Sequence, residues 1–421
     1  MSSIRKHPMM QSLIAFQGNQ RVSLYTEPMW GIPYNLFVPY ASIYMFALGL
    51  SDQEIGLVST IFMACQCVTA LISGVLIDKW GRRRSNLLFD LIAWSIPPLL
   101  WAFSQNVWWF VTAAILNSVT QCCNTSWSCL LVEDGDSKHL VNLYNWITIA
   151  GQISVFFVPI AGLLVGRLGL VPAVRILYGF AFVSMTLKAI LIYAGVREPT
   201  QGRLRMEASR GVPISAMLRD YLPVLRRMLH TRLVLLTLGI MLLLQVCITT
   251  NNTFFSLYVT ENLGVADSLV SVFPMVRAVV MMVFFFALQP ALNRLALRLP
   301  MLAGFALFIV ADLVLILSPH NGTLYFPVLS VLIEASGYAM VFPRRSALIA
   351  LAVDPKDRAR IMALLAVFMI GLSAPFGWTG GWLSSIDRRL PFALIITLSC
   401  AGMALTLCIP KALGVEDSHR L

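Results

Sequence analysis

Charged residues are scarce in this sequence. Aspartate, glutamate, lysine and arginine make up 12% of its 421 residues, whereas 58% of the residues are hydrophobic. Ordinary soluble domains contain ~25% charged residues. A soluble fold could not bury so much apolar surface, so the composition excludes a soluble globular protein and indicates a membrane protein.

Residue patterns that carry catalysis or bind metals are also missing. The five histidines fall in predicted loops or tails, and no His-Glu-x-x-His pattern occurs. The eight cysteines fall in apolar segments and form neither a disulfide framework nor a metal pattern. There is no Gly-x-x-x-x-Gly-Lys-Ser/Thr nucleotide loop. We therefore expect no enzyme activity, no metal and no cofactor.

Apolar segments long enough to cross a ~30 Å hydrocarbon core as helices fill most of the chain. The most polar interruption divides them six and six, which predicts an all-α membrane protein with twelve transmembrane helices in two pseudo-symmetric six-helix bundles. The predicted spans are residues 25–48, 53–77, 85–104, 107–131, 140–166, 172–196, 232–259, 267–291, 299–318, 323–347, 358–383 and 390–411. The predicted domains are an N-terminal segment 1–24, a bundle 25–196, a basic linker 197–231 with an interfacial helix at 213–230, a bundle 232–411 and a tail 412–421.

The net charge of +11 is distributed very unevenly along the chain. Lysines and arginines gather in the N-terminal segment, the linker and the connections that follow even-numbered spans, whereas few lie in the opposite connections. This distribution follows the positive-inside rule and predicts that both termini are cytoplasmic. It argues against nucleic-acid binding. The short loops favour a bacterial cytoplasmic membrane, although Asn321 begins a glycosylation sequon that would matter in a eukaryote.

The connector between the second and third predicted spans is short and strongly basic. It reads Asp78, Lys79, Trp80, Gly81, Arg82, Arg83, Arg84 and Ser85, and Gly74 precedes it by one helical turn. This pattern resembles the loop 2–3 signature of the major facilitator superfamily of transporters, with every signature position filled. The resemblance implies a cytoplasmic gate of Gly74, Asp78, Gly81, Arg82 and Arg83, in which the aspartate grips the start of span 11 when the inner gate is shut. Gly74 is expected to allow a close helix approach.

A weaker copy of this connector supports a duplicated architecture. Aligning Asp78 with Asn293 places Arg294 under Lys79 and Arg298 under Arg83. A second echo links residues 133–138 with residues 354–358. Two related bundles meeting around a central site are a plan found in transporters.

Two charged residues fall near the middle of predicted spans. Arg277 and Glu334 each lie about ten residues from the predicted outer face, or roughly 15 Å deep at 1.5 Å per residue, so their side chains are expected to meet. In the functional interpretation, Glu334 binds the coupling proton or a substrate cation, and Arg277 tunes that carboxylate or holds a substrate carboxylate. The alternative is a permanent salt bridge between two helices. We favour function, because charges at this depth are costly.

The other intramembrane charges lie closer to the span ends. We interpret Lys188 as structural, with a side chain long enough to snorkel to the interface. Asp90 and Asp312 are also interpreted as structural. Glu27 lies at the cytoplasmic end of the first span. We expect its side chain to face either the transport pathway or the lipid headgroups, and neither is favoured.

The resemblance implies that spans 1, 4, 7 and 10 line the pathway, and uncharged polar side chains gather on three of them. Amides mixed with aromatic rings suit an amphipathic organic solute, and interhelical hydrogen bonding is the alternative role. The candidate substrate-binding residues, besides Arg277, are Tyr34, Asn35, Asn117, Gln121, Trp127, Gln245, Asn251 and Asn252. Prolines and glycines mark expected bends at Pro33 and Pro39 in span 1, at Pro159 in span 5 and around Pro375 in span 11. Span 11 is the candidate for a moving gate.

These observations predict a secondary transporter that moves a small organic solute by alternating access. We expect proton coupling, with export favoured and proton-symport uptake of a small acid or zwitterion as the alternative. A transporter-like sensor or a membrane-embedded enzyme is a distant alternative. The expected partners are the solute, H⁺ and membrane lipids, with no nucleic acid, and we expect a monomer.

Overall fold

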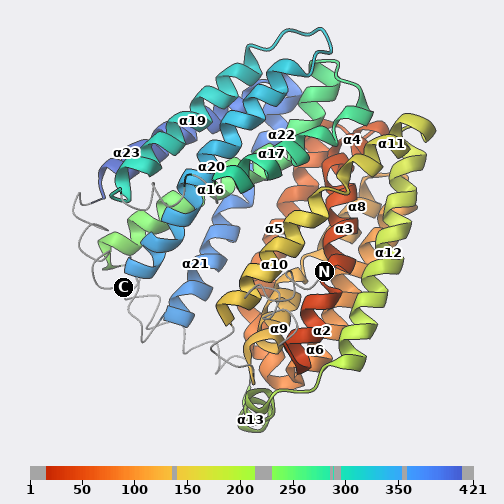
Figure 1. The fold of residues 1–421 in the computed structure, drawn as a ribbon, viewed down its shortest axis with the longest axis vertical. Coiled ribbons are helices and arrows are strands. Elements are labelled where there is room, and N and C mark those ends of the chain that lie inside the picture. The colour runs from red at the N-terminus through yellow and green to blue at the C-terminus, as the bar shows by residue number, and fades with distance from the viewer. Residues whose placement is uncertain are drawn as a thin grey trace, which may run out of the picture. The chain divides into compact units, whose positions relative to one another are not determined.

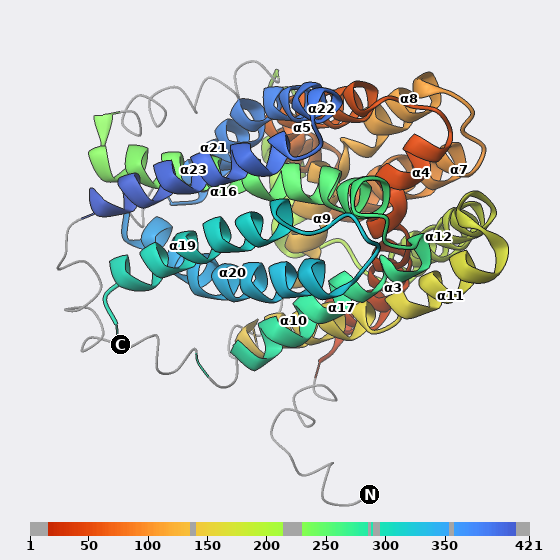
Figure 2. The same ribbon diagram turned by 90° about the horizontal axis from the view of Figure 1, so that it is seen from above.

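The computed structural model of the chain describes residues 16–134, 140–213, 230–284, 288, 295–352 and 358–409. Within these ranges the chain consists of helices and their connections, with no strand (Figures 1 and 2). Within these ranges, eight helical segments are long enough and apolar enough to cross a membrane. The observed secondary structure is therefore the all-helical one that the sequence predicts.

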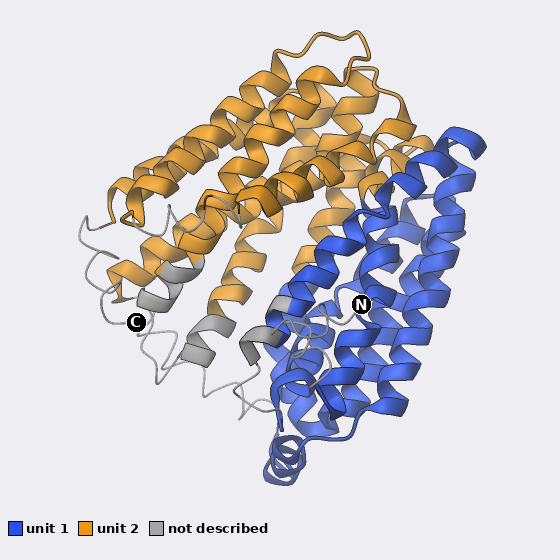
Figure 3. Ribbon diagram, in the orientation of Figure 1, with its two compact units in different colours: residues 1–38, 65–219 blue, residues 39–64, 220–421 orange. Residues whose placement is uncertain are grey.

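Contacts divide the chain into two compact units (Figure 3). Unit 1 comprises residues 1–38 and 65–219, and unit 2 comprises residues 39–64 and 220–421. Residues 39–64 are the end of the first predicted span and the beginning of the second, and they pack with unit 2. The predicted bundles 25–196 and 232–411 are defined by their membrane spans, whereas the two units are defined by contacts. The predicted bundles therefore stay a prediction.

Unit 1 combines two helices near the beginning of the chain with a continuous run from the second half of α5 to the linker. They are α2 (Gly18–Thr26), α3 (Pro28–Phe37), the later part of α5 (Asp52–Trp80), α6 (Arg82–Asp90), η3 (Leu91–Ser95), α7 (Ile96–Ala102), α8 (Val107–Asn117), α9 (Thr120–Val132), α10 (Leu140–Val155), α11 (Val158–Leu168), α12 (Leu170–Gly195) and α13 (Thr200–Ala208).

Unit 2 combines one early segment of the chain with its whole second half. Its helices are the end of η2 (Val38–Tyr40), α4 (Ala41–Ala47), the first part of α5, α16 (Arg232–Leu257), η5 (Tyr258–Asn262), η6 (Asp267–Leu269), α17 (Val272–Val283), α19 (Arg298–Ile316), α20 (Tyr325–Ala352), α21 (Arg358–Ser373), α22 (Pro375–Ile386) and α23 (Leu390–Leu407).

Prolines divide several of the predicted spans. The first span is interrupted by a 3-10 turn that contains Pro39. New helices begin at Val158, directly before Pro159, in the fifth span and at Pro375 in the eleventh. Proline has no N–H for the helical hydrogen bond, so the ladder ends before it. The predicted bends at these three positions are confirmed. Pro33, in contrast, lies inside α3 without ending it.

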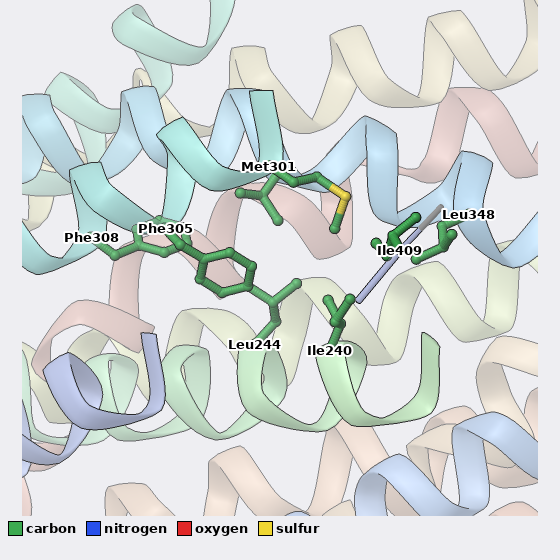
Figure 4. Packing of buried hydrophobic residues seen from close by; sticks show 8 residues of the cluster. Ile240, Leu244, Met301, Phe305, Phe308, Leu348 and Ile409 are labelled. Atoms are coloured by element: carbon green, nitrogen blue, oxygen red, sulfur yellow. The ribbon is translucent and has the colours of Figure 1, made fainter. Parts of the chain in front are cut away.

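Large apolar side chains fill the space between helices of unit 2. Ile240 and Leu244 of α16 pack with Met301 and Phe305 of α19, and residues of α20 complete the cluster (Figure 4). Lipid tails are as apolar as these side chains, so the gain comes from van der Waals contact rather than from removal of surface from water. This packing fixes which face of each helix points inward.

Several predicted features lie outside the described residues. These are most of the N-terminal segment, most of the interfacial helix at 213–230, the connector copy at Asn293 and Arg294, most of its second echo at 354–358, and the tail 412–421.

Candidate functional site

An ion pair joins two helices in the interior of unit 2. Arg277 of α17 donates from Nη2 to Oε2 of Glu334 on α20, at 2.6 Å. Asn251 of α16 donates from Nδ2 to the other carboxylate oxygen, Oε1. Three helices therefore converge on one carboxylate, and the predicted meeting of Arg277 with Glu334 is confirmed.

Exposure differs between the two partners of this ion pair. The Glu334 side chain is 12% exposed, whereas the Arg277 side chain is 32% exposed. The Arg277 Nε atom is buried and has no hydrogen-bond partner among the described residues. The ring of Tyr338 lies 6.0 Å from the guanidinium carbon. The guanidinium thus retains a donor for a further acceptor, and charge-assisted bonds to carboxylates are among the strongest that arginine makes.

The other polar candidates on α16 do not join this pair in the structure. Asn252 is exposed, although its neighbour Asn251 is 5% exposed. Gln245 donates from Nε2 to Thr249 Oγ1 of its own helix at 3.3 Å. Consecutive residues point about 100° apart on a helix, so only one of two adjacent asparagines reaches Glu334.

Two candidate amides of unit 1 bond to backbone carbonyls. Asn117 is buried and donates from Nδ2 to the Ala93 carbonyl at 2.7 Å, in the π-helical turn η3. Asn35 donates to the carbonyl of Gly31 in its own helix, also at 2.7 Å. These contacts match the alternative role of hydrogen bonding within and between helices.

The three remaining candidates of unit 1 are partly buried, and two of them lie against other aromatic rings or a cation. Tyr34 stacks on Trp30 with ring centroids 4.6 Å apart. Trp127 lies 5.9 Å from the Lys188 ammonium, and its indole N–H is buried without a partner among the described residues. Gln121 is half-buried on α9. No polar contact gathers the three into one site among the described residues.

A second buried ion pair lies in unit 1, and the sequence interpretation missed it. Lys188 of α12 donates from Nζ to Glu27 Oε2 at 3.0 Å, and these side chains are only 10% and 15% exposed. The expected snorkelling of Lys188 is therefore wrong, because a carboxylate within reach satisfies the ammonium inside the unit. The depth argument used for Arg277 would not have found this pair, because Glu27 lies two residues and Lys188 eight residues from the predicted cytoplasmic ends of their spans.

The basic connector forms a dense network within unit 1. Arg82 Nη1 donates to Asp78 at 2.8 Å, and its guanidinium lies 3.3 Å from Glu133 at the end of α9. Glu198 accepts the backbone N–H groups of Arg82 at 2.6 Å and Arg83 at 2.8 Å, and so caps the beginning of α6. The sequence indicated Arg82 beside Asp78 but not the two glutamates, which are distant in the chain.

The two glycines of the connector behave differently. Gly81 has φ +83°, a conformation that residues with a side chain rarely adopt. A Cβ atom added there would lie 2.8 Å from Met206 Sδ and 3.1 Å from the Glu198 carboxyl carbon. A Cβ atom added at Gly74 would meet no described atom within 4 Å. No described residue approaches Gly74 closely, so the approach expected there stays a prediction.

The beginning of α5 packs tightly against α22 within unit 2. Thr60 donates to the Ala374 carbonyl at 2.9 Å and accepts the Trp378 N–H at 2.7 Å, and so bridges the break before Pro375. Asp52 is buried and paired with Arg388 at 3.1 Å. This contact places the expected bend of span 11 against a helix from the beginning of the chain.

Comparison with known proteins identifies the family. The Major Facilitator Superfamily family model matches residues 30–378. A multi-drug resistance efflux pump, PmrA, of Streptococcus pneumoniae serotype 4 is 26% identical over 110 residues. That match covers 25% of this chain and only 27% of the length of the pump.

Solved structures share the fold at low sequence identity. The nucleoside transporter NupG superposes with a TM-score of 0.70 and 13% identity, over 93% of this chain and 98% of that one. The peptide transporter POT in complex with sulfate has a TM-score of 0.69 and 16% identity, over 99% of each chain. A POT family transporter in complex with 5-aminolevulinic acid has a TM-score of 0.69 and 12% identity, over 92% of this chain and 94% of that one. The predicted fold class is confirmed.

The match over most of the chain, the shared fold and the filled connector signature agree. The chain belongs to the Major Facilitator Superfamily, and it is a multi-pass integral membrane protein and a secondary transporter rather than an enzyme.

Proposed function

We propose that this protein couples the movement of a small organic solute to a proton, and that Glu334 is the residue at which coupling occurs. The observation that carries the proposal is the convergence of Arg277 and Asn251 on this one carboxylate, inside a membrane-spanning unit. A charged pair at such depth is costly to build. A carboxylate there gains or loses a proton far more readily than a guanidinium does.

Protonation of Glu334 changes what its partners bind. A neutral carboxyl group no longer attracts the guanidinium as an anion does, so the 2.6 Å ion pair with Arg277 weakens. The partly exposed guanidinium of Arg277 is then available, through Nη2, to a solute that carries an acceptor. Loss of the proton restores the pair and displaces the solute. Proton and solute occupancy are linked through one guanidinium.

Export is the favoured direction. The similarity to a multi-drug resistance efflux pump, although it covers 25% of this chain, supports it. The aromatic groups around Tyr34 and Trp30 in unit 1 suit an amphipathic compound. Export needs the proton and the solute to compete for one group. We therefore propose proton-driven export of an amphipathic cation that binds the ionised Glu334 carboxylate until a proton displaces it, whereas the release of Arg277 described above would serve the acidic solute of the alternative.

The partly exposed guanidinium of Arg277 favours a second candidate function. A guanidinium with a spare donor binds a carboxylate in a bidentate manner. Uptake of a small acid or zwitterion by proton symport is therefore the alternative. Competition separates the two candidates, because lipophilic cations would compete with an exported amphipathic substrate and small acids would compete with an imported one.

Proton flux in proteoliposomes tests the proposal. The native protein, challenged with organic cations, acids, sugars and amino acids, is expected to move protons in response to one class. Glu334→Gln keeps the size of the side chain but has no titrating group, so solute-triggered proton flux should fall at least about tenfold. The matched control is Glu261→Gln, at an exposed carboxylate of the same unit, which should leave the flux unchanged. Native flux in Glu334→Gln would refute Glu334 as the coupling residue.

A further inference from the structure

The linker helix α13 is held in place in unit 1 at both of its ends (Figure 1). At its beginning, the Thr200 N–H donates to the Asp134 carboxylate at 2.7 Å, beside the contacts that Glu198 makes with the basic connector. At its end, Ser209 Oγ donates to the Asp78 carbonyl at 3.1 Å. α13 is therefore a packed part of unit 1, fixed against the end of α5.

The helices that hold α13 reach this place from the membrane. α5 and α12 are among the helices long and apolar enough to cross it, and they end at Trp80 and Gly195. Arg83, three residues after α5, donates from Nε to the Tyr193 carbonyl at 2.9 Å, so the two helix ends lie at the same level. Trp80 is 45% exposed, and tryptophan is enriched at the level of the lipid headgroups. α13 therefore lies at a membrane surface, which the charge distribution predicts to be the cytoplasmic one.

A hollow of about 420 Å³, here called the basic hollow, lies between the end of α5 and α13. Three cationic side chains line it, Lys79, Arg203 and Arg210, together with one acidic side chain, Glu207. None of the three cations forms an ion pair or a side-chain hydrogen bond with a residue that the structure describes. The basic hollow therefore carries three positive charges and one negative charge at neutral pH.

Other cations of the same region have partners within the protein. Arg82 is paired with Asp78 and Glu133, and the guanidinium carbon of Arg83 lies 4.3 Å from the centre of the Tyr193 ring. Their charges are thus balanced or held without a ligand. The three cations of the basic hollow lack such partners and repel one another across a shared space. An anion from outside the protein would relieve this repulsion.

We propose that the basic hollow binds the phosphate group of an anionic phospholipid. Arginine binds phosphate in a bidentate manner, and lysine adds a compact positive charge. At about 30 Å³ for each water molecule, the hollow has room for about 14 waters, enough for a phosphate and the glycerol bonded to it. The membrane surface supplies this lipid beside the hollow, and basic pockets at the ends of membrane-spanning helices bind such headgroups. A free phosphate ion has the same chemistry and is the other source of the ligand.

Native mass spectrometry of the full chain in detergent tests the site without any transported solute. The protein is titrated with phosphatidylglycerol, with zwitterionic phosphatidylethanolamine and with inorganic phosphate. The double variant Arg203→Gln, Arg210→Gln should bind phosphatidylglycerol at least about tenfold more weakly, because each basic residue near the membrane surface contributes about fivefold in affinity. The matched control is Arg197→Gln, Arg205→Gln. It removes two exposed arginines of the same region that do not line the hollow, and it should change the affinity less than about twofold.

Equal losses in the two double variants would overturn the inference, because the lipid would then be attracted by the whole basic surface. Equally tight binding of phosphatidylethanolamine would also overturn it. So would displacement of phosphatidylglycerol by an equal concentration of inorganic phosphate, since the free ion would then be the ligand.

A variant that gains affinity excludes misfolding as the cause of these changes. Glu207→Gln removes the acidic side chain of the basic hollow, so it should bind phosphatidylglycerol about fivefold more tightly. Unchanged or weaker binding would contradict the assignment of the phosphate to this hollow. Lipid binding is measured without proton flux, so this inference and the proposed role of Glu334 fail or stand separately.

Discussion

Replacement of Gly56 by alanine should loosen the contact between α5 and α22. A Cβ atom at residue 56 would lie 2.9 Å from the Gly381 Cα atom and 3.0 Å from its nitrogen, and it would also press on the Gly377 carbonyl oxygen. Ordinary van der Waals contact begins at 3.4 Å. The two segments must therefore separate by at least 0.5 Å, which is 3.4 minus 2.9, and no side chain is available to rotate away.

The free-energy cost follows from overpacking. Forcing extra carbon into a well-packed contact costs about 1–3 kcal/mol. If the proposed transport works by alternating access, with a second state in which these segments separate, the added methyl group meets no such obstacle in that state. The equilibrium ratio of the packed to the separated state should therefore fall about 5–150-fold.

Spin labels at residues 53 and 385 measure this ratio. Gln53 and Ser385 are exposed, and their side chains are hydrogen-bonded at 3.1 Å, so the labels lie close together only in the packed state. Gly56→Ala should move population from short to long label distances. Gly179→Ala on α12 is the matched control, because a Cβ atom there meets no described atom within 4 Å. Identical distance distributions in Gly56→Ala and the parent protein would refute the reasoning.

Two further predictions concern the connector in unit 1. Gly81→Ala should destabilise the protein by about 1–3 kcal/mol, because φ +83° is strained for alanine, and thermal unfolding of the purified protein would show this as a lower midpoint. An unchanged midpoint would show that the connector relaxes without cost. Glu198→Gln should cost about 1 kcal/mol, since it removes the negative charge that caps the N–H groups of Arg82 and Arg83. Glu207→Gln, at an exposed residue, is its control, and equal midpoints for the two variants would contradict the capping role.

The sequence alone predicted the elements that depend on composition and spacing. Membrane spans follow from long apolar runs, and helix breaks at Pro39, Pro159 and Pro375 follow from a missing N–H group. The pairing of Arg277 with Glu334 could also be predicted, because depth in a helix is proportional to the number of residues. These properties depend on position along one helix.

The tertiary structure decided which way each helix faces. Membrane helices are apolar on all sides, and lipid is as apolar as a protein core, so hydropathy does not distinguish the two faces. From the sequence, Asn251 and Asn252 are therefore equal candidates for substrate binding. In the structure, packing places Asn251 against Glu334 and leaves Asn252 exposed. Packing likewise brought Lys188 onto Glu27 and buried Asp312 inside unit 2. Length and chemistry along the chain set the depth of each charge, and only the packing of the helices set the partner it meets.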